Sequence, residues 1–181
     1  ILEAGIHVRV VVSNVPHAPA LGIAQTRGVE TVVLPPAGDV GGREARDRQL
    51  IAELQARQID LVALAGYNRV FSPCVVKAFP NRIVNIHPSL LPAFPGLAPG
   101  PQGDALEYGV KVSGCTVHLV TADLDAGPII AQACVPVFPH DTVESLSERI
   151  LAGEHRLFPA VLAQIAAGKL RVEDRKAWLL D

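Results

Sequence analysis

An amide, an imidazole and a carboxylate stand at points of this sequence where strands are expected to give way to loops. Asn85 and His87 open the run Asn85–Gly96, and Asp125 lies in Leu124–Pro128, which begins 28 residues after that run. A hydrogen-bond donor, a group that exchanges protons and an acid that orients them suit acyl transfer through a tetrahedral oxyanion. Each residue alone has a plainer explanation as a turn former or hydrogen-bonded loop residue. The three residues together favour a catalytic role in acyl transfer over these separate structural roles.

The first half of the chain alternates between short apolar runs and helical segments. Strands are predicted at His7–Ser13, Glu30–Leu34, Leu61–Ala65 and Ile83–Ile86, and helices at Ala18–Arg27, Arg43–Gln58 and Ser72–Ala78. This alternation predicts an α/β fold with a mainly parallel twisted sheet flanked by helices. Ligands of such sheets bind beyond the carboxyl ends of the strands, so we expect His87 at the binding edge.

The second half is expected to extend the sheet with mixed strands. The proline-rich stretch Pro88–Gln102 is predicted to be a functional loop, and a short helix follows at Asp104–Tyr108. Further strands are predicted at Cys115–Val120 and Ile129–Val137 around the turn Thr121–Pro128, with an edge strand at Leu170–Glu173. Thr142–Ala166 is predicted to be a helix that Pro159 kinks or breaks, and Ile1–Gly5 the last turn of another.

Composition narrows the class of protein. The 181 residues, 49% hydrophobic and 19% charged, predict one globular domain spanning 1–181. A net charge of −2 argues against nucleic acid as a partner, and strand-length apolar runs argue against a membrane span. Cys74, Cys115 and Cys134 lack metal-site spacing and are interpreted as reduced core thiols of a cytoplasmic protein. No metal is expected, and His118 is interpreted as a core-strand residue.

Several motifs together resemble the folate-dependent formyltransferase family. They are NIHPSLLP followed by PG, LDxGP around Asp125, and the segments Leu64–Pro73, Gly114–Val120 and Glu154–Pro159. The resemblance implies a Rossmann-like fold and transfer of a formyl group from 10-formyltetrahydrofolate. The most similar branch of the family formylates the amine of glycinamide ribonucleotide in purine biosynthesis. By this resemblance Asn85, His87 and Asp125 are the catalytic residues, with Asp125 orienting His87 and helping to move protons.

The resemblance also implies binding residues. Arg69, Val70 and Phe71 match the segment that contacts the folate, and Thr121–Asp125 matches the opposite wall of that pocket. Arg43 and Glu154 match groups that hold the ribonucleotide. Without the resemblance, the simpler interpretation of Phe71 is a core residue. Arg69, Arg43 and Glu154 would then be exposed charged side chains.

Three departures from the family pattern bear on the substrate side. The family opens with a strand and a glycine-rich phosphate loop, and Ile1–Gly5 aligns with the helix after them, so we expect this chain to lack both. The Leu97–Gly103 loop lacks the family's histidines and is longer, and Asn68 stands where methionine is usual.

Other functions stay open at this point. A 10-formyltetrahydrofolate hydrolase would carry a second histidine in place of Pro88, and a methionyl-tRNA formyltransferase more positive charge. A sugar-nucleotide formyltransferase shares the catalytic residues. A non-catalytic folate-binding protein is the alternative from another class. The oligomeric state is not indicated by the sequence.

Overall fold

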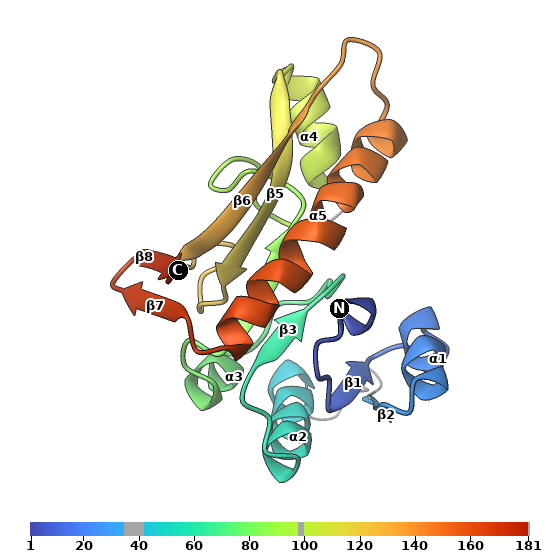
Figure 1. The fold of residues 1–181 in the computed structure, drawn as a ribbon, viewed down its shortest axis with the longest axis vertical. Coiled ribbons are helices and arrows are strands. Elements are labelled where there is room, and N and C mark those ends of the chain that lie inside the picture. Colours follow the sequence, from blue (N-terminus) through green and yellow to red (C-terminus); the bar gives the residue numbers. More distant parts are fainter. Residues whose placement is uncertain (35–41, 98–99, 181) are drawn as a thin grey trace. The chain divides into compact units, whose positions relative to one another are not determined.

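The chain adopts an α/β fold in the computed structural model (Figure 1). The structure describes residues 1–34, 42–97 and 100–180. Contacts within the chain divide it into two compact units. The first unit comprises Ile1–Asp60 and Phe71–Phe79, and the second comprises Leu61–Val70 and Pro80–Asp181.

The first unit is built on a short parallel sheet. Strand β1 (Val10–Ser13) pairs with β2 (Glu30–Val33), and its helices are η1 (Leu2–Ala4), α1 (Pro19–Thr26), α2 (Gly42–Ala56) and α3 (Pro73–Ala78). The predicted helical turn at the start of the chain is present as the 3₁₀ helix η1. Gly5 ends it in the left-handed region at φ 72°, as the glycine stop predicted.

A buried carboxylate joins α2 to α3 in this unit. Asp47 is fully buried, and one oxygen accepts hydrogen bonds from the Ser72 backbone N–H at 2.6 Å and the Ser72 hydroxyl at 2.7 Å. Its other oxygen accepts from Arg46 Nη2 at 2.6 Å and Nε at 3.0 Å. Ser72 stands at the predicted N-cap of α3, but its hydroxyl makes no capping bond because it is donated to Asp47.

The second unit contains a six-stranded mixed sheet. Its order is β3-β4-β5-β6-β8-β7, made of β3 (Val62–Leu64), β4 (Ile83–His87), β5 (Val112–Leu119), β6 (Ile129–Pro136), β7 (Leu170–Glu173) and β8 (Lys176–Leu179). The pairs β3–β4 and β6–β8 are parallel, whereas β4–β5, β5–β6 and β7–β8 are antiparallel. The α/β class and the mixed C-terminal strands are therefore confirmed. The prediction missed β8, which forms a hairpin with the predicted edge strand β7.

Helix α5 (Val143–Ala166) covers one face of β5 and β6 (Figure 1). Leu146 and Ile150 pack against Cys115 of β5 and Val135 of β6 in one buried cluster. Thr142 begins the helix with a capping box shared with Ser145. The helix continues through Pro159, so the expected break is wrong. The buried residues Phe158 and Val161 hold the helix on both sides of the proline.

Two other sequence predictions need correction. Helix α4 spans Gly100–Tyr108, so the predicted loop ends before Gly100 and not at Gln102. Residues 98 and 99 of the Leu97–Gly103 stretch lie outside the described residues. Of the three cysteines interpreted as core thiols, Cys115 is buried, Cys74 is half-buried and Cys134 is exposed.

Asp141, Arg149 and Phe138 form an interacting group, which we call the clasp, in and beside the connection between β6 and α5. Both oxygens of Asp141 accept hydrogen bonds from Arg149 at 2.8 Å, and the Phe138 N–H donates to the same carboxylate at 2.7 Å. The Arg149 guanidinium lies 4.5 Å from the Phe138 ring centroid, a cation–π distance. The hydrogen bonds from Arg149 and then from Phe138 hold the pKa of Asp141 well below its usual 3.8.

We predict that Asp47→Asn lowers the free energy of unfolding by about 3–5 kcal/mol, because Arg46 keeps its buried charge without a counter-ion. Chemical denaturation measures the loss. Glu44→Gln on the same helix is the matched control, since Glu44 pairs with Arg48 in solvent and its removal should change little. Equal effects of the two substitutions would contradict the assigned role of Asp47.

A second prediction concerns the stability of the clasp at low pH. Because the folded-state pKa of Asp141 is lowered, its stabilisation is fully present above about pH 5 and is lost as the pH falls through the folded value. Wild type should therefore have a higher Tm than Asp141→Asn at neutral pH, and the difference should shrink in acid. If the Tm difference is as large in acid as at neutral pH, an ionised Asp141 is not the cause of the stabilisation.

Candidate active site

The antiparallel pair β4–β5 brings four polar side chains to one face of the sheet. Asn85 lies directly opposite His118, and His87 lies opposite Thr116. Residues opposite one another in such a pair share a face, as do residues two apart along a strand. These side chains therefore point to the face away from α5, because α5 packs on the side of Cys115.

Asn85 and His118 are joined by a hydrogen bond whose polarity can be assigned. Asn85 Nδ2 lies 3.2 Å from His118 Nε2, and His118 Nδ1 lies 3.0 Å from the Leu119 carbonyl oxygen. A carbonyl only accepts, so Nδ1 carries the proton and Nε2 of the neutral ring accepts from Asn85. Burial lowers the pKa of His118 from its usual 6.5, which favours this neutral form at pH 7.

His87 ends β4 rather than following it, and its ring is buried between two acceptors. Its Nε2 donates to the Phe94 carbonyl at 3.0 Å. Its Nδ1 lies 3.5 Å from Asp125 Oδ2, and the two side chains are 4% and 6% exposed. This separation is an electrostatic contact at the outer limit of a hydrogen bond, and catalytic hydrogen bonds often tighten only when substrate binds.

Asp125 completes the group from the turn between β5 and β6. Its Oδ2 accepts a hydrogen bond from the Gly96 N–H at 2.8 Å, and its Oδ1 lies 3.7 Å from His118 Nε2. The structure thus brings the three residues predicted to be catalytic together with His118 in one group, which we name the His87 cluster: Asn85, His87, His118 and Asp125. The side chains of the two histidines and of Asp125 are buried, and Asn85 is half-buried.

His118 is the member that the sequence interpretation did not place in the site. It is buried in a strand as predicted, but it contacts Asn85 and Asp125 instead of only filling the core. A signal was present in the sequence. In the predicted strand Cys115–Val120, Thr116 and His118 are polar residues two apart, which indicates a strand with one polar face.

The loop after β4 is held to the same face by hydrogen bonds. Thr116 Oγ1 donates to the Ser89 carbonyl at 2.7 Å and accepts from the Leu91 N–H at 3.0 Å. Ser89 Oγ donates to the Ala93 carbonyl at 2.6 Å and the Phe94 carbonyl at 3.1 Å. The Phe94 carbonyl that receives His87 is therefore fixed from two directions.

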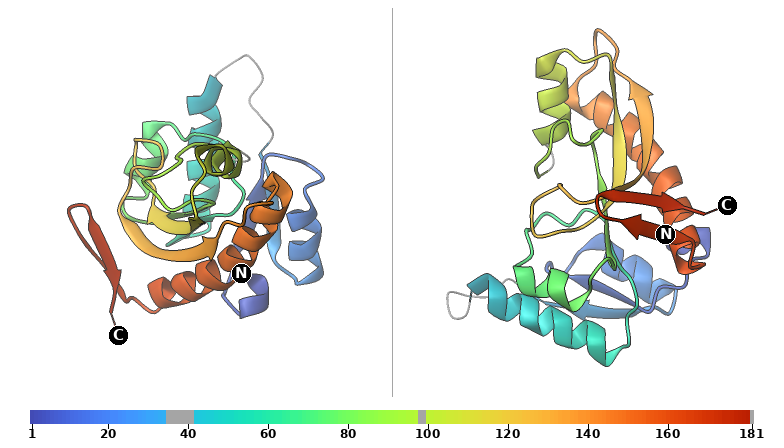
Figure 2. Two further views of the ribbon diagram at one scale, coloured as in Figure 1. Left: turned by 90° about the horizontal axis from the view of Figure 1, so that it is seen from above. Right: turned by 90° about the vertical axis from the view of Figure 1, so that its left-hand side faces the viewer.

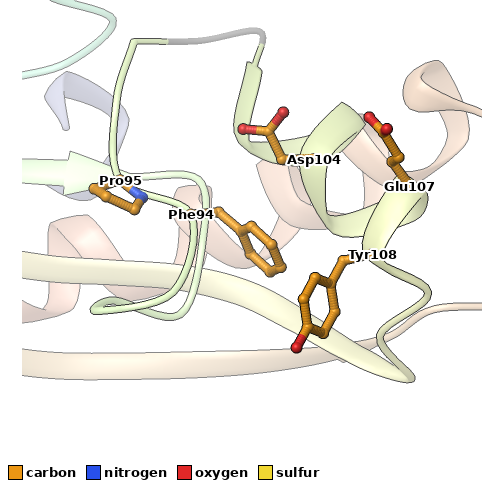
Figure 3. Close-up of a pocket in the computed structure, with 5 residues that line it drawn as sticks. All are labelled: Phe94, Pro95, Asp104, Glu107 and Tyr108. Atoms are coloured by element: carbon orange, nitrogen blue, oxygen red, sulfur yellow. The ribbon is translucent and has the colours of Figure 1, made fainter.

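A shallow hollow lies between this loop and α4 and is lined by Phe94 and Pro95 on the loop side (Figure 3). Its lining includes the Phe94 and Tyr108 rings, which meet edge to face with centroids 5.9 Å apart. Asp104 and Glu107 of α4 lie at its border. The hollow shares Phe94 with the site but contains none of the His87 cluster.

The predicted folate-contact residues fall in both units. Arg69 and Val70 lie in the second unit, in the segment after β3, which leaves the sheet at the same edge as His87 because Leu64 of β3 pairs in parallel with Asn85. Arg69 is half-buried, and its Nε is buried without an acceptor in the part of the chain that the structure describes. Phe71 is buried in the first unit.

Thr121, on the other predicted wall, belongs to the turn that carries Asp125. Its hydroxyl donates to the Asp123 carbonyl at 3.1 Å. Its side chain thus helps to shape the turn from within.

The two predicted ribonucleotide-binding residues are not part of the His87 cluster. Arg43 is exposed in the first turn of α2, in the first unit. Glu154 lies on α5, and it makes no hydrogen bond or ion pair with the cluster among the described residues. Burial raises the pKa of Glu154 above 4.5. Burial, and then the charge of Glu154, raise the pKa of the Cys115 thiol to about 11, so this thiol stays protonated.

The described ranges, residues 1–34, 42–97 and 100–180, show neither a metal-binding group nor a membrane-spanning helix. No group of three or more His, Cys, Asp or Glu side chains there could share a metal ion. No helix there has the length and apolar character that crossing a membrane requires.

Comparison with known proteins identifies the family. Residues 2–162 match the family model described as formyl transferase. The chain is 43% identical over 172 residues to phosphoribosylglycinamide formyltransferase of Escherichia coli K12, covering 95% of this chain and 80% of that protein.

Solved structures agree with this match. Glycinamide ribonucleotide transformylase 1 from Symbiobacterium toebii has a TM-score of 0.93 at 51% identity, covering 99% of this chain and 84% of that one. A formyltetrahydrofolate deformylase from Pseudomonas syringae has a TM-score of 0.86 at 28% identity, covering 96% of this chain and 56% of that one. With the family model matching most of its length, this chain belongs to the formyl transferase family.

Proposed function

We propose that this protein transfers a formyl group from 10-formyltetrahydrofolate to the primary amine of glycinamide ribonucleotide, a step of purine biosynthesis. The observation that carries the proposal is the convergence of Asn85, His87 and Asp125 in one cluster of a formyl transferase family member. Relatives named for this reaction, at 43% and 51% identity, support the choice of substrate.

In the proposed mechanism Asn85 stabilises the oxyanion. The substrate amine attacks the formyl carbon, a C–N bond forms, and negative charge develops on the formyl oxygen. Because His118 Nε2 accepts one Asn85 N–H, the amide cannot rotate freely, and its second N–H remains to donate to that oxygen. A donor already in place costs no reorganisation when the charge develops.

His87 and Asp125 supply charge and move protons. The attacking amine must lose a proton, and N10 of the folate must gain one as its bond to the formyl carbon breaks. An imidazolium at His87, held between the Phe94 carbonyl and Asp125, stabilises the oxyanion through its charge. Its Nε2 is engaged with Phe94, so proton exchange is assigned to the Nδ1 side that faces Asp125.

The binding roles are assigned by family resemblance, with the two units acting as one formyltransferase-like domain. Arg69, Val70 and Phe71, together with Thr121 and Asp125, would hold the folate. The buried Nε of Arg69 supports this, because it needs an acceptor and has none within residues 1–34, 42–97 and 100–180. Arg43 and Glu154 would hold the ribonucleotide. A donor from the substrate would offset the burial that raises the pKa of Glu154.

Both substrates are small molecules, and no nucleic acid takes part in the proposed reaction. The proposal places the protein in the cytoplasm, where its three free thiols would stay reduced.

Deformylation is the nearest alternative, in which water replaces the amine as acceptor. The resemblance to a deformylase structure motivates testing it. The purified protein should be incubated with 10-formyltetrahydrofolate, with and without glycinamide ribonucleotide, while tetrahydrofolate, formate and formylated amine are measured. We expect folate turnover only with the ribonucleotide, and a formylated product in equal amount. Formate release that does not depend on the amine would reject the proposal.

Asp125→Asn should reduce kcat by about 10²- to 10³-fold, because it removes the negative charge beside His87 while keeping the shape of the side chain. Binding of a folate analogue, measured by calorimetry, should stay within about threefold. Asp104→Asn, an exposed carboxylate of the same unit, is the control and should retain wild-type turnover. Near-normal kcat in Asp125→Asn would remove Asp125 from the mechanism.

His118→Phe should lower kcat about 10-fold, because Asn85 then loses the acceptor that fixes its amide. His118→Gln offers an oxygen in place of Nε2 and should recover most of the rate. Steady-state kinetics with circular dichroism as a folding check separate the two variants. If Gln and Phe are equally impaired while folded, the acceptor role assigned to His118 is wrong.

A further inference from the structure

The turn that carries Asp125 adopts a backbone conformation that needs external support. Asp125 has φ 50°, in the left-handed region that non-glycine residues rarely enter. Such conformations persist only where the surrounding structure determines them from several sides, and they concentrate at functional sites. The groups that hold this turn therefore decide where the Asp125 carboxylate points.

Restraints within the turn account for part of this support. The Leu119 N–H donates to the Pro128 carbonyl at 2.9 Å and closes the base of the turn. Gly127 lies so close to β5 that a Cβ atom there would be 1.8 Å from the Leu119 carbonyl oxygen, so only glycine fits. The Ala126 N–H also lies 3.5 Å from the Asp123 carbonyl oxygen. None of these contacts holds the Ala126 carbonyl, in the peptide unit between Ala126 and Gly127.

Arg175 supplies the contact to the Ala126 carbonyl from another part of the chain. Its Nη1 donates to the Ala126 carbonyl at 3.0 Å across 49 residues of sequence. Strands β7 and β8 form the red hairpin in Figure 2. Arg175 lies in its two-residue connection between Glu173 and Lys176. Lys176 pairs with Ile129, the first residue of β6, so the sheet itself brings the hairpin tip beside the turn.

We propose that Arg175 is a positioning residue for the reaction, acting through the Ala126 carbonyl on the orientation of Asp125. The Asp125 carboxylate is held at its outer end by the Gly96 N–H, and its backbone is held on the next residue by Arg175. Fixing both ends keeps Oδ2 facing His87 Nδ1. This role rests on the proposed formyl transfer, but the contact itself can be tested without it.

Arg175→Ala should lower kcat by about 3- to 10-fold, as expected for one lost hydrogen bond to a guanidinium at an exposed position. The KM for glycinamide ribonucleotide should stay within about twofold, because Arg175 is not among the residues assigned to hold the ribonucleotide. Arg175→Lys keeps a charged donor and should restore at least half of the lost rate. In ¹H–¹⁵N spectra of the substrate-free protein, Arg175→Ala should shift the amide signals of Asp125, Ala126 and Gly127.

Arg171→Ala is the matched control, since Arg171 lies in the same hairpin and also donates to backbone carbonyls, those of Gly168 and Leu170. It should leave kcat and the turn signals unchanged. Equal losses in the two alanine variants would overturn the proposal, because the hairpin as a whole would then be responsible. Unchanged kcat in Arg175→Ala would overturn it as well.

The two proposals can fail separately. If the wild-type protein transfers no formyl group, the proposed function fails, and the amide signals alone decide whether Arg175 holds the turn. Signals of Asp125–Gly127 that do not move in Arg175→Ala would then reject the positioning role.

Discussion

The register between β4 and β5 is the constraint on which the site depends. Asn85 faces His118 and His87 faces Thr116 only in this alignment of the two strands. A slip of one residue would turn each side chain to the other face of the sheet, against the apolar surface of α5. The apolar side chains between them, Ile86 and Val117 among others, oppose such a slip because it would expose them to the polar loop. The packing that stabilises this unit therefore also selects the arrangement of the His87 cluster.

Burial of this cluster demands that its polar atoms be paired. Unpaired buried donors and acceptors are costly, and a network that satisfies them fixes a single arrangement. His118 illustrates this, since the Leu119 carbonyl sets its tautomer and the tautomer in turn sets which atom Asn85 presents. The Phe94 carbonyl likewise requires a proton on Nε2 of His87. Backbone carbonyls thus determine the protonation pattern of the side chains proposed to do the chemistry.

The sequence predicted those parts of the structure that local patterns specify. Short β-branched runs located the strands, and the polar residues at their ends located Asn85, His87 and Asp125. Partners distant in sequence could not be predicted in this way. Neither Arg175 near Ala126 nor His118 near Asp125 follows from a local pattern, because both contacts depend on strand order. The predicted break at Pro159 was wrong for a related reason, because tertiary packing outweighed the tendency of proline to break a helix. Family resemblance supplied binding roles for Arg43 and Glu154 that the fold alone does not assign.

The bond between Asp47 and Ser72 also bears on how the protein is made. The first unit is discontinuous, because Phe71–Phe79 joins it after the chain has passed through β3 of the other unit. A ribosome that has released only residues 1–60 has delivered Arg46 and Asp47 without the N–H and hydroxyl groups that complete their network. Folding of the amino-terminal region during synthesis must therefore wait for α3, and a protease that cut between the two stretches would separate parts of one folding unit.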